Sequence, residues 1–492
     1  MNLPKEIQWV LSQLRDHSHE AFVVGGSVRD LLLGREPKDW DVATSATPEK
    51  IQEVFPDSFY TNTFGTVTVR IPSKQTNPIT EVEVTTYRID AEYSDARHPD
   101  SVSFTTSLRE DLSRRDFTVN AMALGDSKEA KGADEVVIND YVIIDHFGGI
   151  QDIQKKVIKA VGVPGDRFQE DALRMMRAVR FATQLEFEIE ENTLSSLQDN
   201  LKGIEAVSWE RIRDELVKII MSEHPERGMN LLLSTGMLSY ILPELVEGVG
   251  VGQNKHHVFT VFEHNVKSAQ FAAQFNYPLH VRLAALLHDI GKPRTKRKQG
   301  SDYTFYAHDI VGARMAEKLL TRLRFPKTLV DQITHLVRYH MFYYDVDEVT
   351  EAGTRRLLAR VGLDAFDDLI KLRIAERKGS GVPKALPYRL RHLQYMAEKV
   401  SQQPLSTAQL AIDGSDLMSE LNIPGGPIIG GVLQALLAEV IEDPQKNTRE
   451  ILFARAKELS TQDPAVLKKL GGAVIRAEEK KREDDIRRKY RV

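Results

Sequence analysis

Residues 22–51 read FVVGGSVRDLLLGREPKDWDVATSATPEKI, and this stretch decides the fold that we predict for the beginning of the chain. An apolar run ends in Gly25-Gly26, a helical pattern follows, and a second apolar run carries Asp39 and Asp41. Side chains alternate along a strand, so the two aspartates are expected on one face. The glycines let backbone amides approach phosphate oxygens closely, and the start of the helix adds a favourable dipole. Paired carboxylates beside such a loop suit phosphoryl transfer with a pair of Mg²⁺ ions.

Each part of this pattern also has a simpler interpretation. A Gly-Gly pair alone is weak support for a phosphate loop, and Asp-x-Asp on a strand is more often surface charge or a turn. The combination at this spacing, with VRDLLLG between the two parts, favours catalysis. A third carboxylate is expected on a neighbouring strand, where Glu83 in EVEVTTYR is preferred to Glu81. Both glutamates share a face, so at most one of them is expected to be a metal ligand.

The pattern of secondary structure changes along the chain. The runs AFVVGG, DWDVAT, FGTVTVRI and EVEVTTY predict strands of a mixed or antiparallel sheet. After YVIIDHFGGI, long amphipathic helices are predicted, such as DRFQEDALRMMRAVRFATQL and ERIRDELVKIIM. The fold class is therefore α+β, with an α/β head followed by mostly helical domains. A chain of 492 residues exceeds one hydrophobic core, and we expect domains at residues 1–145, 146–250, 251–385 and 386–492.

Composition restricts the class of protein. No apolar run approaches the ~18 residues that a bilayer requires, and the N-terminus has no pattern of an export signal, so no membrane partner is expected. The absence of cysteine excludes disulfides and thiolate metal sites and favours a cytoplasmic setting. A net charge of -5 argues against coating nucleic acid through bulk charge, although a local basic groove remains open. The C-terminal RAEEKKREDDIRRKYRV is more simply a solvated or frayed helix than a basic arm that grips RNA.

A family resemblance rests on GGSVRDLLLGREPKDWDVAT, followed by EDLSRRDFTVNAMAL. Together they resemble the head of the class II tRNA nucleotidyltransferases and bacterial poly(A) polymerases, within the polymerase-β-like superfamily, over most of residues 20 to 240. The resemblance implies a polymerase-β-like head and stepwise transfer of CMP, CMP and AMP from CTP and ATP onto tRNA, without a nucleic-acid template. The partners are then tRNA, ATP and CTP, and the metal ion is Mg²⁺.

The resemblance also implies site residues. In the family, the segment RRDFTxNA contacts the incoming nucleotide. Arginine recognises phosphate bidentately, and Asp or Asn can bond ribose hydroxyls, so the chemistry of these residue types agrees. The predicted catalytic residues are Asp39, Asp41 and Glu83, and the predicted nucleotide-binding residues are Gly25, Gly26, Arg29, Arg114, Arg115, Asp116, Asn120, Glu170, Asp171, Arg174, Arg177 and Arg180.

Nucleotide choice is assigned to GDRFQEDALRMMRAVRFA, where Glu170, Asp171 and Arg174 are expected on one helix. Their spacing also fits an intrahelical salt bridge worth only ~0.2–0.5 kcal/mol. The alternative is that a carboxylate and the guanidinium imitate a base-pairing edge, which selects C and A and rejects U and G. EDALR matches the nucleotide-selecting motif EDxxR of the family, and the resemblance therefore favours selection.

Two further segments resemble the neck of the family. DHFGGIQDIQKKVIKAVG is similar to the turn before the neck, although Lys159 stands where the family usually has arginine. The last neck motif is represented in VSWERIRDELVKII by Ser208, Glu210, Arg211 and Glu215. Ser208 is equally well explained as a helix N-cap.

The segment TTYRIDAEYSDARHPDSVSF around Arg97 resembles the flexible loop that full CCA-adding enzymes use when they switch from C to A. Enzymes of the family that add only CC lack part of that loop. Its presence favours CCA addition or A addition over CC addition, and does not separate the first two.

The middle of the chain is rich in histidine. His264, His288, Asp289, His308 and His340 lie in a pattern that resembles the HD metal-dependent phosphohydrolases. The resemblance implies a second divalent metal, with His264, His288 and Asp289 among its ligands. RIAERKGSG places Glu376 where these proteins often have Asp, so an active phosphohydrolase and a vestigial domain that only packs and binds RNA both remain open.

Several activities therefore compete with CCA addition. Within the enzyme class, the rivals are an A-adding enzyme that works with a separate CC-adding partner, and a poly(A) polymerase. Outside it, the chain could be chiefly an HD phosphohydrolase whose head only binds nucleotide, or a silent RNA-binding protein. Residues 405–460 resemble the RNA-binding end of the family, which predicts that the tail binds tRNA.

Overall fold

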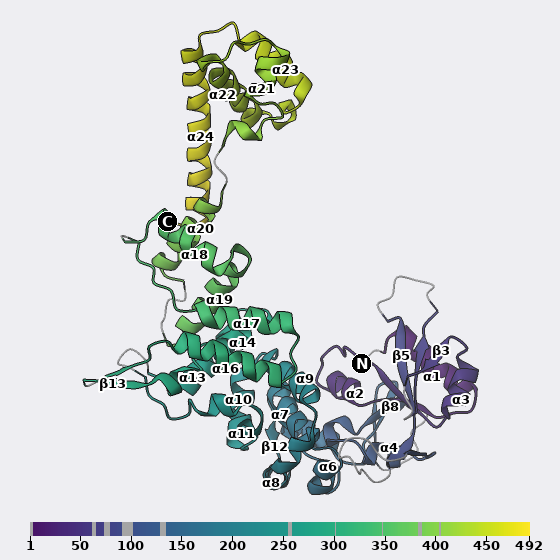
Figure 1. Ribbon diagram of the computed structural model, residues 1–492. Coiled ribbons are helices and arrows are strands. Elements are labelled where there is room, and N and C mark those ends of the chain that lie inside the picture. Colours follow the sequence, from purple (N-terminus) through teal and green to yellow (C-terminus); the bar gives the residue numbers. More distant parts are fainter. Residues whose placement is uncertain are drawn as a thin grey trace. The chain divides into compact units, whose positions relative to one another are not determined.

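The computed structural model describes residues 3–61, 65–72, 79–90, 102–127, 134–253, 258–300, 302–346, 348–381, 386–402 and 405–492 (Figure 1). The chain forms two compact units, Met1–His340 with Lys371–Pro383 and Met341–Ile370 with Lys384–Val492. Each unit combines two chain segments because helix α19 (Leu363–Gly379) passes from the second unit into the first. The boundaries of the four domains expected from the sequence stay a prediction. Within the described ranges, no helix is both long and apolar enough to cross a membrane.

The first unit begins with a mixed sheet that has eight strands among the described residues. Its strands, in spatial order, are β3 (Ser58–Tyr60), β4 (Thr66–Arg70), β5 (Glu81–Thr86), β2 (Asp41–Thr44), β1 (Ala21–Val24), β8 (Ala123–Asp126), β10 (Tyr141–Ile144) and β9 (Glu135–Ile138). The pair β2–β5 is parallel, and the other neighbours are antiparallel. The four strands predicted from the sequence are confirmed, and the sheet is mixed.

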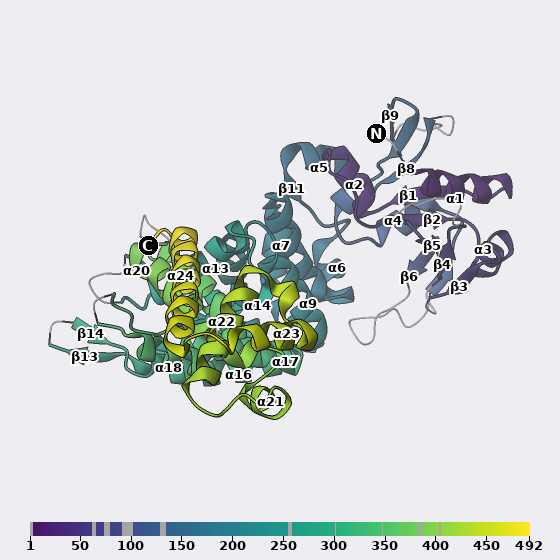
Figure 2. The same ribbon diagram turned by 90° about the horizontal axis from the view of Figure 1, so that it is seen from above.

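Helices enclose the central strand β1, in which every residue is buried. Phe22 and Val24 pack with Leu108 and Leu112 of α4 (Leu108–Ser113). Figure 2 shows α1 (Lys5–Asp16) beside β1, with α3 (Pro48–Val54) beside β3 and β4. The packing of β1 therefore also fixes the position of the turn that follows it and of α2 (Gly26–Leu32) after the turn.

The register of three strands brings two acidic residues together. Val24, the last residue of β1, pairs with Asp41, the first residue of β2. Asp41 in turn pairs with Glu83 of β5. A one-residue shift would turn either side chain to the other face of the sheet, so this register is a requirement of the site.

Helices follow the sheet in the first unit. They are α5 (Gly149–Lys155), α6 (Pro164–Glu170), α7 (Leu173–Leu185), α8 (Glu191–Asp199), α9 (Trp209–Ile220), α10 (Pro225–Ser234), α11 (Leu238–Ile241) and α12 (Pro243–Val246). The helix predicted from ERIRDELVKIIM is confirmed as α9. The single helix predicted over residues 166–185 is wrong, because the chain is extended at Asp171, with φ −146° and ψ 103°. The Asp171 carboxylate accepts a hydrogen bond from the Leu173 amide at 3.1 Å, which offers the backbone an alternative to the helix.

The histidine-rich segment forms a helical bundle within the first unit (Figure 1). Its helices are α13 (Val261–Gln274), α14 (Leu279–Leu287), α15 (Lys292–Thr295), α16 (His308–Arg322) and α17 (Lys327–Tyr339). A short hairpin, β13 (Arg297–Gln299) with β14 (Asp302–Thr304), lies between α15 and α16. Thr260 and Glu263 form a capping box that fixes the start of α13.

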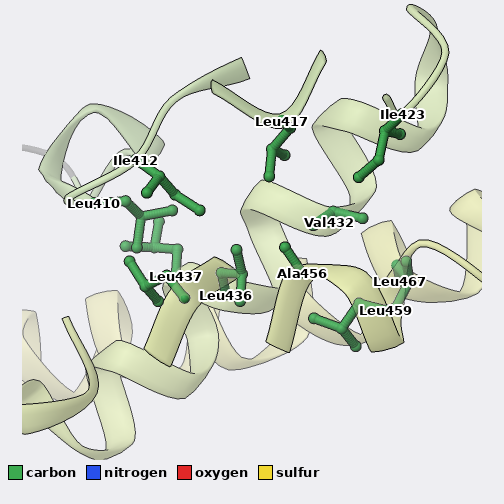
Figure 3. Packing of buried hydrophobic residues seen from close by; sticks show 11 residues of the cluster. Leu410, Ile412, Leu417, Ile423, Val432, Leu436, Leu437, Ala456, Leu459 and Leu467 are labelled. Atoms are coloured by element: carbon green, nitrogen blue, oxygen red, sulfur yellow. The ribbon is translucent and has the colours of Figure 1, made fainter. Parts of the chain in front are cut away.

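The second unit has its own hydrophobic core. Its helices include α18 (Glu351–Val361), α20 (Tyr388–Ser401), α21 (Gly414–Glu420), α22 (Pro427–Glu442), α23 (Arg449–Leu459) and α24 (Pro464–Tyr490). Figure 3 shows Leu417 of α21, Leu436 of α22 and Leu459 of α23 converging in this core. Gly471 of α24 lies so close to α22 that a Cβ atom there would be 2.6 Å from a backbone oxygen of Gln434.

The charged C-terminus is an ordered part of the second unit. It continues α24, and Ile486 is buried with Tyr395 and Met396 of α20. Tyr395 donates a hydrogen bond to Glu483 at 2.6 Å, and Lys489 lies 2.6 Å from Glu398. The helix expected from the sequence is therefore present, and its end is docked rather than frayed.

Candidate functional site

Three carboxylates gather where β1, β2 and β5 meet. Asp39 and Asp41 both line a cleft of about 1190 Å³, and Asp41 also lines an adjoining smaller cavity with Glu83. Asp39 was expected on the strand, but β2 begins only at Asp41. On the β1 side, the ladder ends where Val24, the last residue of β1, pairs with Asp41.

Electrostatics disfavours the charged form of two of these carboxylates. Burial raises the pKa of Asp41 above its ordinary value, although solvent reaches part of the side chain; Arg115 opposes the shift and Asp39 adds to it. Burial also raises the pKa of Glu83, with further contributions from Asp41 and then Asp39. Oxygen ligands at this density suit a hard divalent cation. Glu81, by contrast, lies 3.6 Å from Arg70 and outside both cavities, so the geometry favours Glu83.

Gly25 separates the carboxylates from the nearest arginine. Its φ is 77°, a conformation that glycine adopts without strain. A Cβ atom at this position would lie 3.0 Å from Arg115 Nη1 and 3.5 Å from Asp41 Oδ2. The glycine therefore leaves room for a guanidinium and a carboxylate to face the same space.

Asp111 orients the two arginines of the RRD segment. Its Oδ1 atom accepts from Arg114 Nη2 at 2.7 Å, and its Oδ2 atom accepts from Arg115 Nη2 at 3.3 Å. Burial would raise the pKa of Asp111, but Arg114 and then Arg115 hold it below its ordinary value. The sequence analysis missed this residue, although its spacing of three and four residues from the arginines on a helix was a usable signal.

A second buried network connects the head to α7. Asp116 accepts from Asn120 Nδ2 at 3.1 Å and from Arg177 Nε at 2.7 Å. Asn120 Oδ1 accepts from Arg29 Nη1 at 2.6 Å. Burial would raise the pKa of Asp116, but Arg177 and the hydrogen bond from Asn120 lower it to about 2. This network holds Arg29 and Arg177 at the cleft.

Phe181, which sequence reasoning missed, lies at the centre of a cluster of three predicted arginines. Arg180 lies 4.0 Å from the ring centroid, Arg29 5.2 Å and Arg177 5.3 Å. Arg180 also pairs with the buried Glu215 at 2.6 Å. Burial lowers the pKa of Arg180 to about 10 despite that carboxylate. An aromatic face and matched carboxylates thus let three like charges converge.

The predicted selection motif divides into two parts. Asp171 pairs with Arg211 at 2.7 Å, and Asp171 and Arg174 both line the cleft. Glu170 pairs with Arg167 and Arg174 and does not line the cleft. The salt bridge that was the alternative to a role in nucleotide choice is therefore present at Glu170, whereas Asp171 faces the cleft.

The cleft gathers most of the predicted nucleotide and metal residues, from both the sheet and the helices of the first unit. Those that line it are Gly25, Gly26, Arg29, Asp39, Asp41, Arg114, Arg115, Asp116, Asn120, Asp171, Arg174, Arg177 and Arg180. Glu83 lies in the adjoining cavity with Arg88. The core of the predicted flexible loop, with Arg97, lies outside the described residues.

The turn before the neck is joined to the RRD segment. The Thr118 amide donates to the Lys159 carbonyl at 2.9 Å, and the Val161 amide donates to the Asp116 carbonyl at 3.2 Å. A Cβ atom at Gly149 would lie 2.3 Å from the Thr118 carbonyl oxygen. Lys159 contributes its backbone here, so this contact does not depend on whether the residue is lysine or arginine.

The last neck motif is only partly at the site. Arg211 and Glu215 contact the cleft residues Asp171 and Arg180. Ser208 is the N-cap residue of α9, as the structural interpretation predicted, but its side chain makes no capping hydrogen bond.

A separate cluster lies in the helical bundle. It consists of the buried residues His264, His288, Asp289, His308 and His340, with the half-buried Glu376 of α19 beside them. The ligand atoms form two groups in which all atoms lie within 4.8 Å of one another. Arg373 donates to both oxygens of Glu376 at 2.5 and 2.7 Å.

Family models match three parts of the chain. The poly A polymerase head domain matches residues 21–159, the probable RNA and SrmB-binding site of polymerase A matches 186–248, and the HD domain matches 261–375. The fold and the cleft therefore define a nucleotidyltransferase with a poly(A)-polymerase-type head and an HD domain.

Relatives cover nearly the whole chain. The CCA-adding enzyme of Limosilactobacillus reuteri is 32% identical over 92% of this chain and 96% of its own length. That of Geobacillus kaustophilus is 31% identical over 90% and 94%. The structure of the Bacillus stearothermophilus CCA-adding enzyme in complex with CTP is 29% identical, covers 93% of this chain and 98% of its own, and has a TM-score of 0.58. The chain belongs to the family of CCA-adding enzymes.

Proposed function

We propose that this protein adds CMP, CMP and AMP, from CTP and ATP, to the 3′ end of tRNA. The observation that carries the proposal is one cleft in which Asp39 and Asp41 face a cluster of arginines, with Asp171 on its wall. The names of the relatives, and the CTP bound by the Bacillus stearothermophilus enzyme, support this substrate class. A cytoplasmic setting stays a prediction from composition.

Asp39, Asp41 and Glu83 are the residues that would hold Mg²⁺. When bound, the ions supply a lowered pKa at the attacking 3′-hydroxyl and neutralise charge on the triphosphate. Arg115 lies beside Gly25 and Asp41, where it can bind phosphate oxygens bidentately.

Asp116 is a positioning residue in this proposal. Its carboxylate is buried and already accepts hydrogen bonds from Asn120, Arg177 and the Phe117 amide. It therefore fixes Arg177 rather than binding a ribose hydroxyl directly. The sequence suggested that Asp or Asn of this segment bonds a ribose hydroxyl. With Asp116 in a positioning role, Asn120 is the remaining candidate for that contact.

Nucleotide choice is assigned to Asp171 and Arg174, with Arg211 holding the Asp171 carboxylate. The carboxylate can accept from the exocyclic amino group that C and A share, and the guanidinium can donate to the adjacent ring acceptor. U and G present a carbonyl oxygen to Asp171, and two acceptors then face each other. A site that leaves such groups unpaired rejects the wrong base.

Extension of two tRNAs separates the proposal from its rivals within the enzyme class. The pure protein is incubated with labelled CTP and ATP and either tRNA lacking CCA or tRNA ending in CC. We expect extension of both, stopping at CCA. Extension of only the CC-ended tRNA would identify an A-adding enzyme that needs a CC-adding partner, and continued A addition would identify a poly(A) polymerase.

Hydrolysis of phosphate esters by the HD domain is a second candidate activity, favoured by the buried histidine cluster. It is measured in the variant Asp39→Ala/Asp41→Ala, whose head is inactive. Release of phosphate from a nucleoside monophosphate that is lost again in His288→Ala supports the activity. Equal release by both variants contradicts it and leaves the vestigial interpretation.

A further inference from the structure

Helix α9 carries two of the contacts that hold the nucleotide cleft in shape. Arg211 pairs with Asp171 at 2.7 Å. Glu215, one turn further along the helix, pairs with Arg180 at 2.6 Å. Asp171 and Arg180 both line the cleft. The position of α9 therefore determines where the carboxylate assigned to nucleotide choice and one arginine of the cleft lie.

The helical bundle of the histidine-rich segment holds the C-terminal end of α9. Its helix α14 packs against α9 (Figure 1). Arg282 of α14 is buried, and its Nη1 atom donates to the carbonyl oxygens of Ile220 at 3.1 Å and Ser222 at 3.0 Å. The last carbonyls of a helix have no partner within it, and a cation at this end also meets the negative pole of the helix dipole. Arg282 thus fixes one end of α9 to the bundle.

A second helix of the bundle, α16, holds the N-terminal turn of α9. Arg213 Nη1 donates to the carbonyl oxygen of Arg324 at 2.5 Å. Arg324 lies in the turn that ends α16, with φ 57°. Arg322, the last residue of α16, lies 5.6 Å from the ring centroid of Trp209, the first residue of α9. Both ends of α9 are therefore attached to the bundle.

Arg322 has a defined orientation at this contact. Its Nη1 and Nη2 atoms bond the two carboxylate oxygens of Glu244 at 2.6 and 2.9 Å, and Nη2 also donates to the Ile241 carbonyl at 3.1 Å. Two parallel bonds to a carboxylate fix the plane of a guanidinium as well as its position. The Trp209 ring therefore meets a fixed group rather than a mobile charge, and the start of α9 is held beside α11 and α12.

Nucleotide choice depends on α9 more directly than the metal carboxylates do. Asp171 lies in the extended break between α6 and α7, where Arg211 holds its carboxylate. Asp41, by contrast, begins β2 of the sheet. Hydrogen bonds to a base edge weaken steeply when their distance or angle changes. A small displacement of α9 would thus alter recognition of the base and leave the metal carboxylates in place.

We propose that the helical bundle positions α9 for nucleotide choice, with Arg322 as a positioning residue. The proposal rests on the function proposed for the head and on the role of Asp171 within it. It gives the bundle a part in tRNA completion that requires no hydrolysis of a phosphate ester. Residues of the bundle outside its histidine cluster carry this part.

Competition between nucleotides tests the proposal in the full chain. Wild type and Arg322→Met are incubated with tRNA lacking CCA, labelled CTP and increasing UTP. Methionine keeps an apolar stem beside Trp209 but cannot form the paired hydrogen bonds to Glu244. We expect discrimination against UTP to weaken by about 5-fold, while kcat for CTP stays within about 2-fold. A fall in kcat with unchanged discrimination would overturn the proposal.

Arg294→Met is the matched control. Arg294 of α15 forms the same kind of bidentate pair, with Glu247 at 2.6 and 2.8 Å, but that pair lies outside α9. Discrimination should be unchanged in this variant. Equal weakening in Arg294→Met and Arg322→Met would contradict the proposal, because the loss would then follow from loosening the bundle in general.

Arg322→Lys keeps the test decisive if the methionine variant does not fold, as thermal unfolding would show. Lysine retains the charge and can donate to Glu244, but it lacks the planar fork of arginine. Its discrimination against UTP should lie between that of wild type and that of Asp171→Ala. Discrimination equal to wild type would count against a positioning role for Arg322.

A double variant separates failure of this proposal from failure of the proposed function. If Arg322 acts through Asp171, Arg322→Met adds no further loss of discrimination to Asp171→Ala, whereas additive losses would show another route and overturn the proposal. If Asp171→Ala weakens discrimination and Arg322→Met does not, only the positioning role fails. If wild type incorporates no CMP, or Asp171→Ala leaves nucleotide choice unchanged, both proposals fail.

Discussion

The head cleft and the histidine cluster hold their acidic groups in opposite ways. In the cleft, Asp39 and Asp41 are exposed to solvent, and arginines supply the opposing charge. In the bundle, Asp289 is buried among imidazoles. An open site suits an ion that keeps part of its shell of water ligands and enters with the substrate. A closed, nitrogen-rich site suits an ion that remains bound to the protein.

The strongest test of this contrast is Asp41→Ala. We expect nucleotide incorporation to fall by about 10³-fold, because several kcal/mol of charge stabilisation are lost at the reacting phosphate. Metal bound in the bundle should be unchanged. If bundle metal falls as well, the two sites are not independent and the contrast is broken.

The variants Glu83→Gln and Glu81→Gln test which glutamate of β5 is a metal ligand in the head cleft. We expect incorporation to fall by about 10²-fold for Glu83→Gln, since one ligand carboxylate loses its charge. Glu81→Gln is the matched control on the same strand face and should retain activity. Equal losses of steady-state incorporation in the two variants would contradict the assignment of Glu83, rather than Glu81, as the metal ligand of β5.

The buried Asp116 network that lines the cleft should control stability at low pH. The pKa of Asp116 is lowered to about 2 in the folded protein. Its ordinary value is about 3.9, so its charge contributes about 2–3 kcal/mol at neutral pH, and this contribution is lost as the pH falls from about 4 to 2. Urea unfolding of wild type and Asp116→Asn should differ at pH 7 and converge near pH 2. A difference that persists at pH 2 would point to packing instead.

Asp111→Asn tests whether the arginines of the open site need a positioning carboxylate. We expect KM for the nucleoside triphosphate to rise by about 10-fold, because a hydrogen bond to a charged group is worth about 1.5–3 kcal/mol. Glu53→Gln, which breaks an exposed pair with Lys50 on α3, is the control. A drop in kcat with unchanged KM would reject a role in binding phosphate.

The smallest expected effect is that of Asp171→Ala on nucleotide choice. We expect discrimination against UTP and GTP to weaken by about 5- to 10-fold, as the loss of one base contact implies. Binding of the triphosphate should change less, because its arginines remain. Unchanged nucleotide choice in competition assays would reject the role of Asp171.

The sequence predicted the sheet well, including the strands that carry the predicted metal carboxylates, because strands depend on local patterns. Period-two alternation identified β5, and the glycine pair identified the turn before α2. The break at Asp171 was not predictable, because the helical spacing of apolar residues continues through it. The hydrogen bond from the Leu173 amide to the Asp171 carboxylate does not alter that spacing. Phe181 was missed, and Arg211 was named only as part of the neck motif without its pairing to Asp171. That pairing joins residues that are distant along the chain, and Phe181 also contacts an arginine far away in sequence.

The seam between residues 116–120 and 157–161 has a consequence for engineering. Backbone hydrogen bonds and the Phe117–Ala160 bridge tie the strip that carries Asn120 to the strip that leads into α6. In the function proposed above, the residues for phosphate recognition and those for base recognition then lie on backbone strips whose spacing is fixed by these hydrogen bonds. A chimera that exchanges heads between relatives should carry both strips from the same parent, because a join between them would mix two independently fitted halves.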